Sequence, residues 1–262
     1  MCSRTGTDQA SARKPGLANV TVADSLPSID FNEFRKVVET RRSVRKFTAE
    51  TVPDSVVDEC LDLALLSPNS SNLQPWEFWV IRDPKLREQL VPALMNQNAA
   101  RTAQALVCVL GRRDTWREHA AALLRDYPGG NPPDIVRKYY TSHSQFIYEQ
   151  GRWGWRGPFK RLILWWRGRK AALVRDPVTV PAQREWVTKT CALAAQTFVL
   201  AMRARGYDTC PMEGFDRHRV AKILPLPDDA WIVMFIACGK RAEKGVYGAR
   251  YRVPRTDVVK YL

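Results

Sequence analysis

Two short segments of the chain are rich in arginine. The segment RRSVRKF, residues 41–47, combines the hydroxyl of Ser43 with the closely spaced guanidinium groups of Arg41, Arg42 and Arg45. Near the C-terminus, Arg250 and Arg252 lie two residues apart, so in an extended backbone their side chains project from one side. Guanidinium and hydroxyl groups make the charge-assisted hydrogen bonds that a phosphate monoester needs. These segments indicate a phosphate site, although exposed basic turns would have the same composition.

A polar run, SPNSSNLQPW at residues 67–76, separates an apolar helical pattern from a strand-like one. Its amides and hydroxyls offer hydrogen-bond donors and acceptors on a loop held rigid at both ends by proline. A planar heterocycle with alternating N–H and C=O groups would be matched by such donors and acceptors. A turn stabilised by Asn and Ser side chains, followed by a strand, is the alternative interpretation.

A third candidate segment, PMEGFD at residues 211–216, places Glu213 and Gly214 after a short predicted strand. Glycine lets a backbone approach a flat ligand closely, but a simple turn would also explain it. The sequence has no G-x-G-x-x-G, P-loop, G-x-S-x-G or H-E-x-x-H motif, so a Rossmann-type nucleotide site and the common hydrolytic sites lack support. No His or Cys pair has metal-ligand spacing, and we therefore predict no metal site.

The composition bounds the class of protein. A chain of 262 residues with 45% hydrophobic and 26% charged residues can bury a sizeable core. Half of the net charge of +14 comes from residues 145–175, and this charge favours anionic partners. The N-terminus lacks the apolar region of a signal peptide and no apolar run would span a bilayer, so we expect a cytoplasmic protein. The cysteines show no C-x-x-C spacing, and we interpret them as small buried hydrophobes.

Periodicity predicts the elements that must position these segments. We expect helices at 29–40, from 54 until Pro68, and at 83–90, 186–205 and 216–224, with strands at 77–81, 105–111 and 231–239. Asp30 is the expected N-cap of the first helix, and Gly206 the residue that ends the helix 186–205. That helix is apolar almost all round, so we expect it to be buried by the core or by a second subunit. The fold class is α/β or α+β with a central sheet.

Taken in order, RRSVRKF, SPNSSNLQPWEFWVI, PMEGFD and RYRVP resemble the motifs of the FMN-dependent nitroreductase superfamily. The resemblance implies an α+β sandwich of a mostly antiparallel sheet flanked by helices, in an intertwined homodimer with FMN at the interface. The resemblance further implies one nitroreductase-like domain at 29–262, with a basic, Trp-rich insertion at about 112–185. We expect residues 1–28 to form a mobile arm, because the opening of the chain is rich in Ser, Thr, Ala and Gly.

The resemblance also assigns roles to residues. Arg41, Arg42 and Ser43 would hold the FMN phosphate, with Arg250 and Arg252 closing on it. Arg45 and Asn96 would approach the pyrimidine edge of the ring, where a positive charge stabilises the reduced flavin. Glu213 and Gly214 would lie beside the flavin N5 and O4, and Pro68, Asn69, Ser70, Asn72 and Gln74 would reach the ring from the neighbouring subunit. Hydride would be transferred at flavin N5, without a catalytic side chain.

The implied function is an FMN-dependent oxidoreductase that takes hydride from NADH or NADPH and passes two electrons, by a ping-pong mechanism, to a small-molecule acceptor. Nitroaromatics, quinones and enones are the candidate acceptors. Reductive dehalogenation and flavin fragmentation are alternatives within the superfamily. A non-catalytic flavin-binding or membrane-surface protein is an alternative of another class.

The basic insertion leaves its own alternatives open. It could be a lid over the flavin, a helix lying in a membrane interface through residues 145–175, or an excursion packed on the partner subunit. Binding to nucleic acid is the least favoured of its interpretations.

Overall fold

The computed structural model describes residues 28–151 and 154–262. The arm predicted for residues 1–28 lies, apart from Ser28, outside the described residues, as do Arg152 and Trp153 of the insertion.

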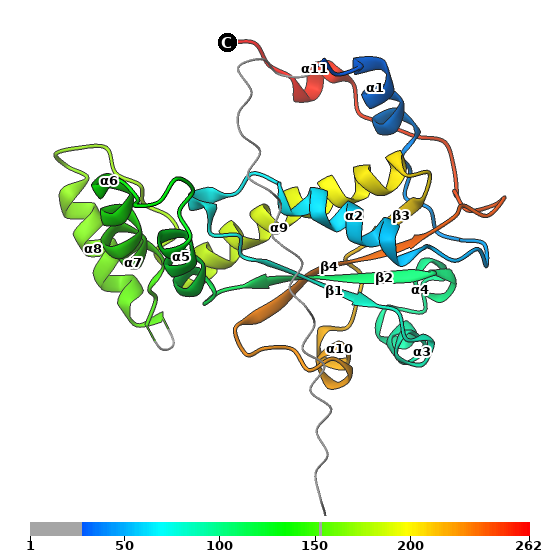
Figure 1. The fold of residues 1–262 in the computed structure, drawn as a ribbon, viewed down its shortest axis with the longest axis horizontal. Coiled ribbons are helices and arrows are strands. Elements are labelled where there is room, and N and C mark those ends of the chain that lie inside the picture. Colours follow the sequence, from blue (N-terminus) through cyan, green and yellow to red (C-terminus); the bar gives the residue numbers. More distant parts are fainter. Residues whose placement is uncertain (1–27, 152–153) are drawn as a thin grey trace, which may run out of the picture.

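A four-stranded sheet forms the centre of the molecule (Figure 1). Its order is β1-β2-β4-β3 and every neighbouring pair is antiparallel, with strands β1 Trp76–Ile81, β2 Ala105–Arg112, β3 Asp208–Met212 and β4 Ala230–Gly239. The inner strands β2 and β4 are almost wholly apolar because helices cover both faces of the sheet. The predicted α+β fold with an antiparallel sheet flanked by helices is confirmed.

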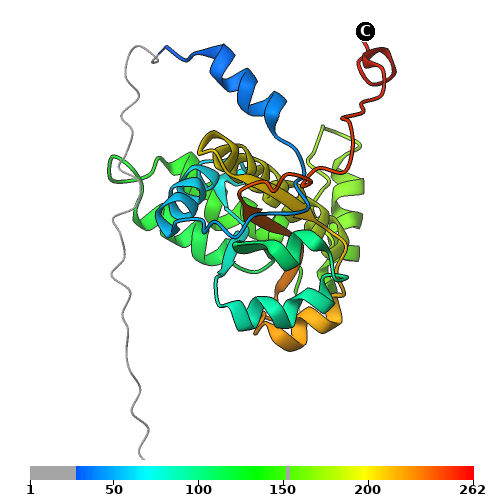
Figure 2. The ribbon, with the colours of Figure 1, turned by 90° about the vertical axis from the view of Figure 1, so that its right-hand side faces the viewer.

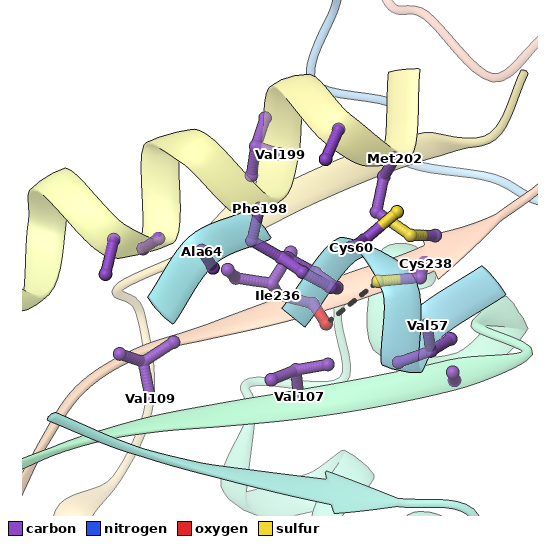
Figure 3. Close-up of a cluster of buried hydrophobic side chains, with 14 of the residues drawn as sticks. Val57, Cys60, Ala64, Val107, Val109, Phe198, Val199, Met202, Ile236 and Cys238 are labelled. Carbon is purple, nitrogen blue, oxygen red and sulfur yellow. Dashed lines mark hydrogen bonds between the residues drawn. The ribbon is translucent and has the colours of Figure 1, made fainter. Parts of the chain in front are cut away.

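One face of the sheet is covered by helices α2 (Asp54–Leu65) and α9 (Val180–Ala204). Figure 3 shows the resulting core, in which side chains of α2 and α9 meet those of β2 and β4. Phe198 is completely buried at its centre. The cysteines at 60, 108, 191, 210 and 238 are buried and free, as expected of small apolar side chains. Burial raises the pKa of the Cys60 thiol to about 11, so it stays protonated near neutral pH.

The opposite face is covered by three short helices, α3 (Pro84–Ala93), α4 (Asn98–Thr102) and α10 (Arg217–Ile223). Leu106, Cys108 and Leu110 of β2 point to this side, while Val107 and Val109 between them point to the other. Because alternate side chains of the strand point to opposite faces, the sheet has one hydrophobic core on each face.

The insertion folds into helices at one end of the sheet, and its elements are α5 Trp116–Arg125, α6 Asp134–Lys138, the π-helical turn η2 Tyr139–His143, α7 Ser144–Tyr148 and α8 Arg156–Arg167 (Figure 1). A separate small core joins it to the polar run through the completely buried Leu73, which packs with Trp116 and Tyr148.

Two terminal helices project from the opposite end of the molecule (Figures 1 and 2). They are α1 (Phe31–Thr40) and α11 (Arg255–Val258), and neither contains a buried residue. Asp30 caps α1 as predicted, because its carboxylate accepts hydrogen bonds from the amides of Asn32 and Glu33.

Most predicted elements agree with the structure to within three residues at each end, but α9 begins six residues before the predicted Trp186. Thr179 caps it by accepting from the Ala182 amide, and Pro181 lies in the first turn, where it is tolerated. The predicted end is confirmed, since Gly206 follows the helix with φ of 79°. Across residues 28–151 and 154–262, no helix has the length and apolar character needed to cross a membrane. The predicted cytoplasmic location stays a prediction.

Candidate functional site

The first arginine segment lies alongside the edge strand β3. Ser43 forms a parallel bridge with Thr209, and the Val44 amide donates to the Thr209 carbonyl at 3.0 Å. On its other side the Arg45 amide donates to the Gly245 carbonyl at 2.7 Å. The completely buried Val44 anchors the segment in the core, so the polar residues around it are held in a fixed backbone.

The two arginine segments, about 200 residues apart in sequence, meet here. Arg250 Nη2 donates to the Arg41 carbonyl, and Arg42 Nη2 donates to the Gly248 carbonyl at 2.5 Å. The pKa of the Arg41 guanidinium is lowered by burial and then by the charges of Arg250, Arg252 and Arg42. Within the described residues none of these four arginines forms a salt bridge. An anion would relieve their mutual repulsion.

A buried carboxylate holds the backbone next to the first arginine segment through two further arginines. Asp208, at the start of β3, is 5% exposed and accepts from Arg241 Nη2 at 2.7 Å and Arg203 Nη1 at 3.2 Å. The same two arginines bond Thr40, the residue before Arg41: Arg203 Nε donates to its hydroxyl at 3.0 Å and Arg241 Nη2 to its carbonyl at 3.4 Å. This network fixes where α1 ends and the arginine segment begins.

A second group of predicted residues lies next to the first. Arg45 Cζ stands 5.5 Å from the centroid of the Tyr247 ring, whose hydroxyl accepts from Asn98 Nδ2 at 3.1 Å. Gln97 directly precedes Asn98, and its Nε2 donates to the Gly214 carbonyl at 2.7 Å. Asn96 precedes Gln97, and its left-handed backbone, with φ of 52°, leaves the side chain exposed.

The turn after β3 leaves room for a ligand. Glu213 and Gly214 are both exposed. A Cβ atom built on Gly214 would meet only Gln97 Nε2, at an ordinary contact distance of 3.5 Å, and φ of Gly214 is not in the left-handed region. Nothing within the described chain requires glycine at this position, so the space that it leaves is available to a bound molecule.

The polar run at 67–76 is a tight loop containing the short 3₁₀ turn η1 (Ser70–Asn72). Asn69 Oδ1 accepts from the Gln74 amide at 2.8 Å, and Asn69 Nδ2 donates to the Ser67 carbonyl at 3.3 Å. Ser71, Asn72 and Gln74 have φ of 59°, 47° and 45°, an uncommon backbone for residues other than glycine. Pro68, Ser70 and Asn72 are exposed.

The insertion holds this loop in place. Ser71 Oγ lies 2.6 Å from the Tyr139 hydroxyl and 3.0 Å from the Tyr148 hydroxyl, while the Tyr140 hydroxyl donates to the Ser71 carbonyl at 2.8 Å. His119 Nδ1 lies 2.7 Å from the Leu73 carbonyl. The π-helical turn supplies Tyr139 and Tyr140, and both side chains reach Ser71.

A pocket of about 580 Å³ opens beside the loop at Asn72. Its other walls come from the insertion and are Leu123, Tyr127, Pro128, Ile135, Val136, Tyr139 and Tyr140. The lining is mainly apolar and aromatic with a few hydroxyl groups, which is typical of a site for a small aromatic molecule.

Within one chain the loop and the arginine cluster are separated. The arginine segment precedes α2 and the loop follows it, and this helix of 12 residues is about 18 Å long. Figure 1 shows the two segments at opposite ends of α2. The structure therefore brings Arg41, Arg42, Ser43, Arg45, Asn96, Glu213, Gly214, Arg250 and Arg252 to one end, and Pro68, Asn69, Ser70, Asn72 and Gln74 to the other.

Comparison with known proteins decides the family. The profile of the Nitroreductase family matches residues 38–240. The chain belongs to the nitroreductase family. The predicted superfamily membership is thereby confirmed, and with it the prediction of an enzyme of the NAD(P)H- and FMN-dependent nitroreductase type.

Individual relatives agree with the family over most of their length. YdgI of Bacillus subtilis (strain 168), a protein assigned as an NAD(P)H nitroreductase, is 28% identical over 238 residues, which are 89% of this chain and 99% of YdgI. The crystal structure of YdfN from Bacillus subtilis, also assigned as a nitroreductase, has a TM-score of 0.71 at 25% identity and covers 89% of this chain and 100% of its own. A structure from Exiguobacterium sibiricum, assigned as a nitroreductase and solved in complex with FMN, has a TM-score of 0.64 at 23% identity, over 90% of this chain and 99% of its own.

Several residues of this nitroreductase-family site were missed from sequence. The missed residues near the arginine cluster are Tyr247, which stacks with Arg45 and bonds Asn98, and Gln97, which bonds the Gly214 carbonyl. The missed residues at the 67–76 loop are Tyr139 and Tyr148, which bond Ser71. The GVYGARYRVP segment could have indicated Tyr247, because its aromatic residue lies close to the arginine pair. The tyrosines carried no local signal, since only the fold of the insertion brings them to Ser71. In residues 28–151 and 154–262 no group of three or more His, Cys, Asp or Glu side chains could hold a metal ion.

Proposed function

We propose that this protein binds FMN between two protomers and uses it to pass electrons from NADH or NADPH to a small-molecule acceptor. The arginine cluster carries the proposal, because four guanidinium groups without carboxylate partners in the described chain need an anion. A phosphate monoester fits them, since it offers two charges and several acceptor oxygens.

Residues of the cluster divide into two roles in this proposal. Arg41, Arg42, Ser43, Arg250 and Arg252 bind the phosphate. Arg45, stacked on Tyr247, lies one residue beyond the completely buried Val44 and presents its charge to the pyrimidine edge of the ring. A cation at that edge stabilises negative charge on the reduced ring. Asn96 and the turn at Glu213 and Gly214 border the same space, since Gln97 ties their two loops together.

The loop at 67–74 completes the site from a second copy of the chain. Support comes from its separation from the arginine cluster along α2, which prevents one protomer from supplying both walls. A second observation supports a homodimer: α1 exposes an apolar face, with Phe31 at 62% and Phe34 at 51%. Covering such an apolar face with a partner chain is favourable, because it removes apolar surface from water.

FMN supplies a ring that accepts hydride at N5 and returns two electrons, and the protein contributes binding, orientation and charge. The small number of histidines in the sequence, three, is compatible with this chemistry, since no side chain has to transfer a proton in the hydride step. In the proposed dimer, the aromatic pocket at Asn72 lies beside the wall formed by the loop, so it is the candidate acceptor site. Its tyrosine-lined wall fits nitroaromatics, quinones and enones, and the protein binds donor and acceptor in turn.

Absorbance spectroscopy of the purified protein tests the proposal. We expect a flavin spectrum after reconstitution with FMN, loss of the absorbance near its visible maximum on anaerobic addition of NADH or NADPH, and its recovery on adding a quinone or nitroaromatic. A protein that stays colourless with excess FMN would overturn the cofactor assignment. A protein that binds FMN but is reduced by neither nicotinamide would overturn the electron donor alone.

A further inference from the structure

Helix α8 in the insertion has a buried inner face and an exposed apolar face. The inner face is buried through Gly157, Lys160 and Leu164. On the opposite side, Trp155, Phe159, Leu162 and Trp166 are 57%, 65%, 63% and 59% exposed. At 3.6 residues per turn these four fall within an arc of about 60°. The outward face is thus a continuous apolar stripe, which we call the outer stripe.

Basic side chains border the outer stripe on both sides. Arg156 and Arg167 lie on one flank and Arg161 on the other, and all three are exposed. The turn after the helix adds Arg169, whose Cζ lies 3.6 Å from the Trp165 ring centroid, and Lys170, whose Nζ lies 5.6 Å from that of Trp166. From Arg156 to Arg175 the sequence contains no acidic residue.

The packing of the inner face fixes the direction of this surface. Lys160 is 5% exposed, and its Nζ donates to the Ile147 carbonyl at 3.2 Å and to the Glu149 carbonyl. Leu164 is 7% exposed on the same side. The helix cannot turn its outer stripe inward without exposing these two residues. Figure 1 shows α8 at the end of the molecule opposite α1 and α11, away from the arginine cluster.

We propose that α8 docks this protein onto an anionic membrane surface, with the outer stripe among the lipid headgroups and acyl chain ends. Aromatic and leucine side chains flanked by arginine and lysine are the composition that lies in such an interface. The flanking cations would meet anionic headgroups, and the long side chains of arginine and lysine reach them while the helix lies flat. The cation–aromatic pairs add to this arrangement because both groups favour the headgroup level.

The arrangement of the charges favours lipid over the other occupants. A nucleic acid would meet cations at the centre of its contact, whereas here the centre is apolar and the cations form the rim. A second copy of the chain would place two sets of five or more cations against each other without an acid in this segment to neutralise them. An anionic bilayer accepts the apolar centre among its lipids and neutralises the cations at the rim with its headgroups.

Vesicle flotation of the full-length protein tests this inference. We expect it to float with vesicles of phosphatidylglycerol and phosphatidylcholine but not with phosphatidylcholine alone. The variant Phe159→Glu/Trp166→Glu alters two exposed side chains and should lower the bound fraction by about tenfold or more, since it removes apolar area and adds repulsion. The control Lys85→Gln/Lys222→Gln lowers the net charge by the same two units on α3 and α10 and should float like wild type.

Circular dichroism and the FMN spectrum of each variant show that the fold and the flavin site are retained. Equal flotation of wild type and Phe159→Glu/Trp166→Glu would overturn the inference, as would binding to neutral and anionic vesicles alike. Binding to an oligonucleotide instead of vesicles, or a change of oligomeric state in the α8 variant by light scattering, would assign the surface to another partner.

Discussion

At the scale of single residues, Arg41 is the most informative position. Its guanidinium is half-buried next to three other cations, and the structure offers it no carboxylate among the described residues. Burial and repulsion lower its pKa, so both act against the charged form and cost folding free energy. Such an unfavourable arrangement is typical of a binding site, where the ligand supplies the missing charge.

The double variant Arg41→Ala/Arg252→Ala should bind FMN more weakly by about 3 to 6 kcal/mol, because each charged hydrogen bond to a phosphate contributes about 1.5 to 3 kcal/mol. Fluorescence titration of the apoprotein with FMN measures the change. Without FMN the variant should melt no lower than wild type, since repulsion is removed. Lys85→Ala/Lys222→Ala, with the same charge change elsewhere, should retain full affinity; an unchanged FMN affinity in the arginine variant contradicts the assignment.

A second prediction at this scale concerns Ser71, whose hydroxyl meets those of Tyr139 and Tyr148. Ser71→Ala should lower the free energy of unfolding by about 1 to 3 kcal/mol, because two part-buried hydroxyls lose a partner. Hydrogen exchange of residues 67–75 should rise in the variant. Thr141→Ala, which removes an exposed hydroxyl bonded only to the Arg137 carbonyl, is the control and should leave that exchange unaltered.

At the scale of elements, α8 depends on a lysine that is buried for structural reasons. Lys160 donates to the carbonyls at the end of α7 and lowers their cost of burial. Burial lowers the pKa of Lys160 from 10.5 to about 8, with the nearby Arg156 acting in the same direction and Glu149 against it. The charged form is therefore disfavoured in the folded protein relative to the unfolded chain.

The sign of the pH dependence follows from this. Between pH 8 and 10.5 the unfolded chain binds the proton of Lys160 and the folded protein does not, so stability rises with pH across this window. From pH 7.5 to 9.5 the wild type should gain about 1 to 2 kcal/mol relative to Lys160→Met. Urea unfolding of both proteins at several pH values measures the difference. Parallel pH profiles would show that Lys160 is not the titrating group.

At the scale of the whole molecule, the two ends differ in kind. One end carries α1, α11 and the arginine cluster, and the other carries the insertion with the loop and the aromatic pocket (Figure 1). A site that needs both sets of residues requires two chains arranged so that opposite ends meet. In the proposed dimer, the exposed apolar faces of α1 and of the C-terminal segment, where Val258 is 67% exposed, would wrap around the partner.

Phe31→Ser/Phe34→Ser should therefore shift the protein from dimer to monomer and release FMN in parallel. Sedimentation velocity gives the oligomeric state, and the flavin absorbance of the same sample gives the cofactor content. Phe159→Ser, which changes an equally exposed phenylalanine of α8, should leave both unchanged. A wild-type protein that is monomeric and still retains FMN would contradict the two-chain site.

Local patterns in the sequence were sufficient for much of the fold. Alternating and continuous apolar runs predicted β1, β2 and β4, and a single capping residue predicted each of the ends at Asp30 and Gly206. The predicted start of α9 was wrong, because the first turns of this helix are more polar than the rest and depend on the Thr179 cap. The short helices of the insertion were not predicted individually, since their apolar residues serve several neighbours at once.

The sequence by itself determined which kinds of group this protein possesses: guanidinium pairs, an amide-rich loop and a basic aromatic segment, each contained in a few consecutive residues. Only the tertiary structure decided which of these meet. It brought Arg250 to Arg41 and sent the 67–74 loop to the other end of α2. It also decided that the outer stripe of α8 and the face of α1 remain uncovered within one chain. The physical reason is that apolar periodicity specifies a face to be buried but not the surface that buries it, because the hydrophobic effect has no direction.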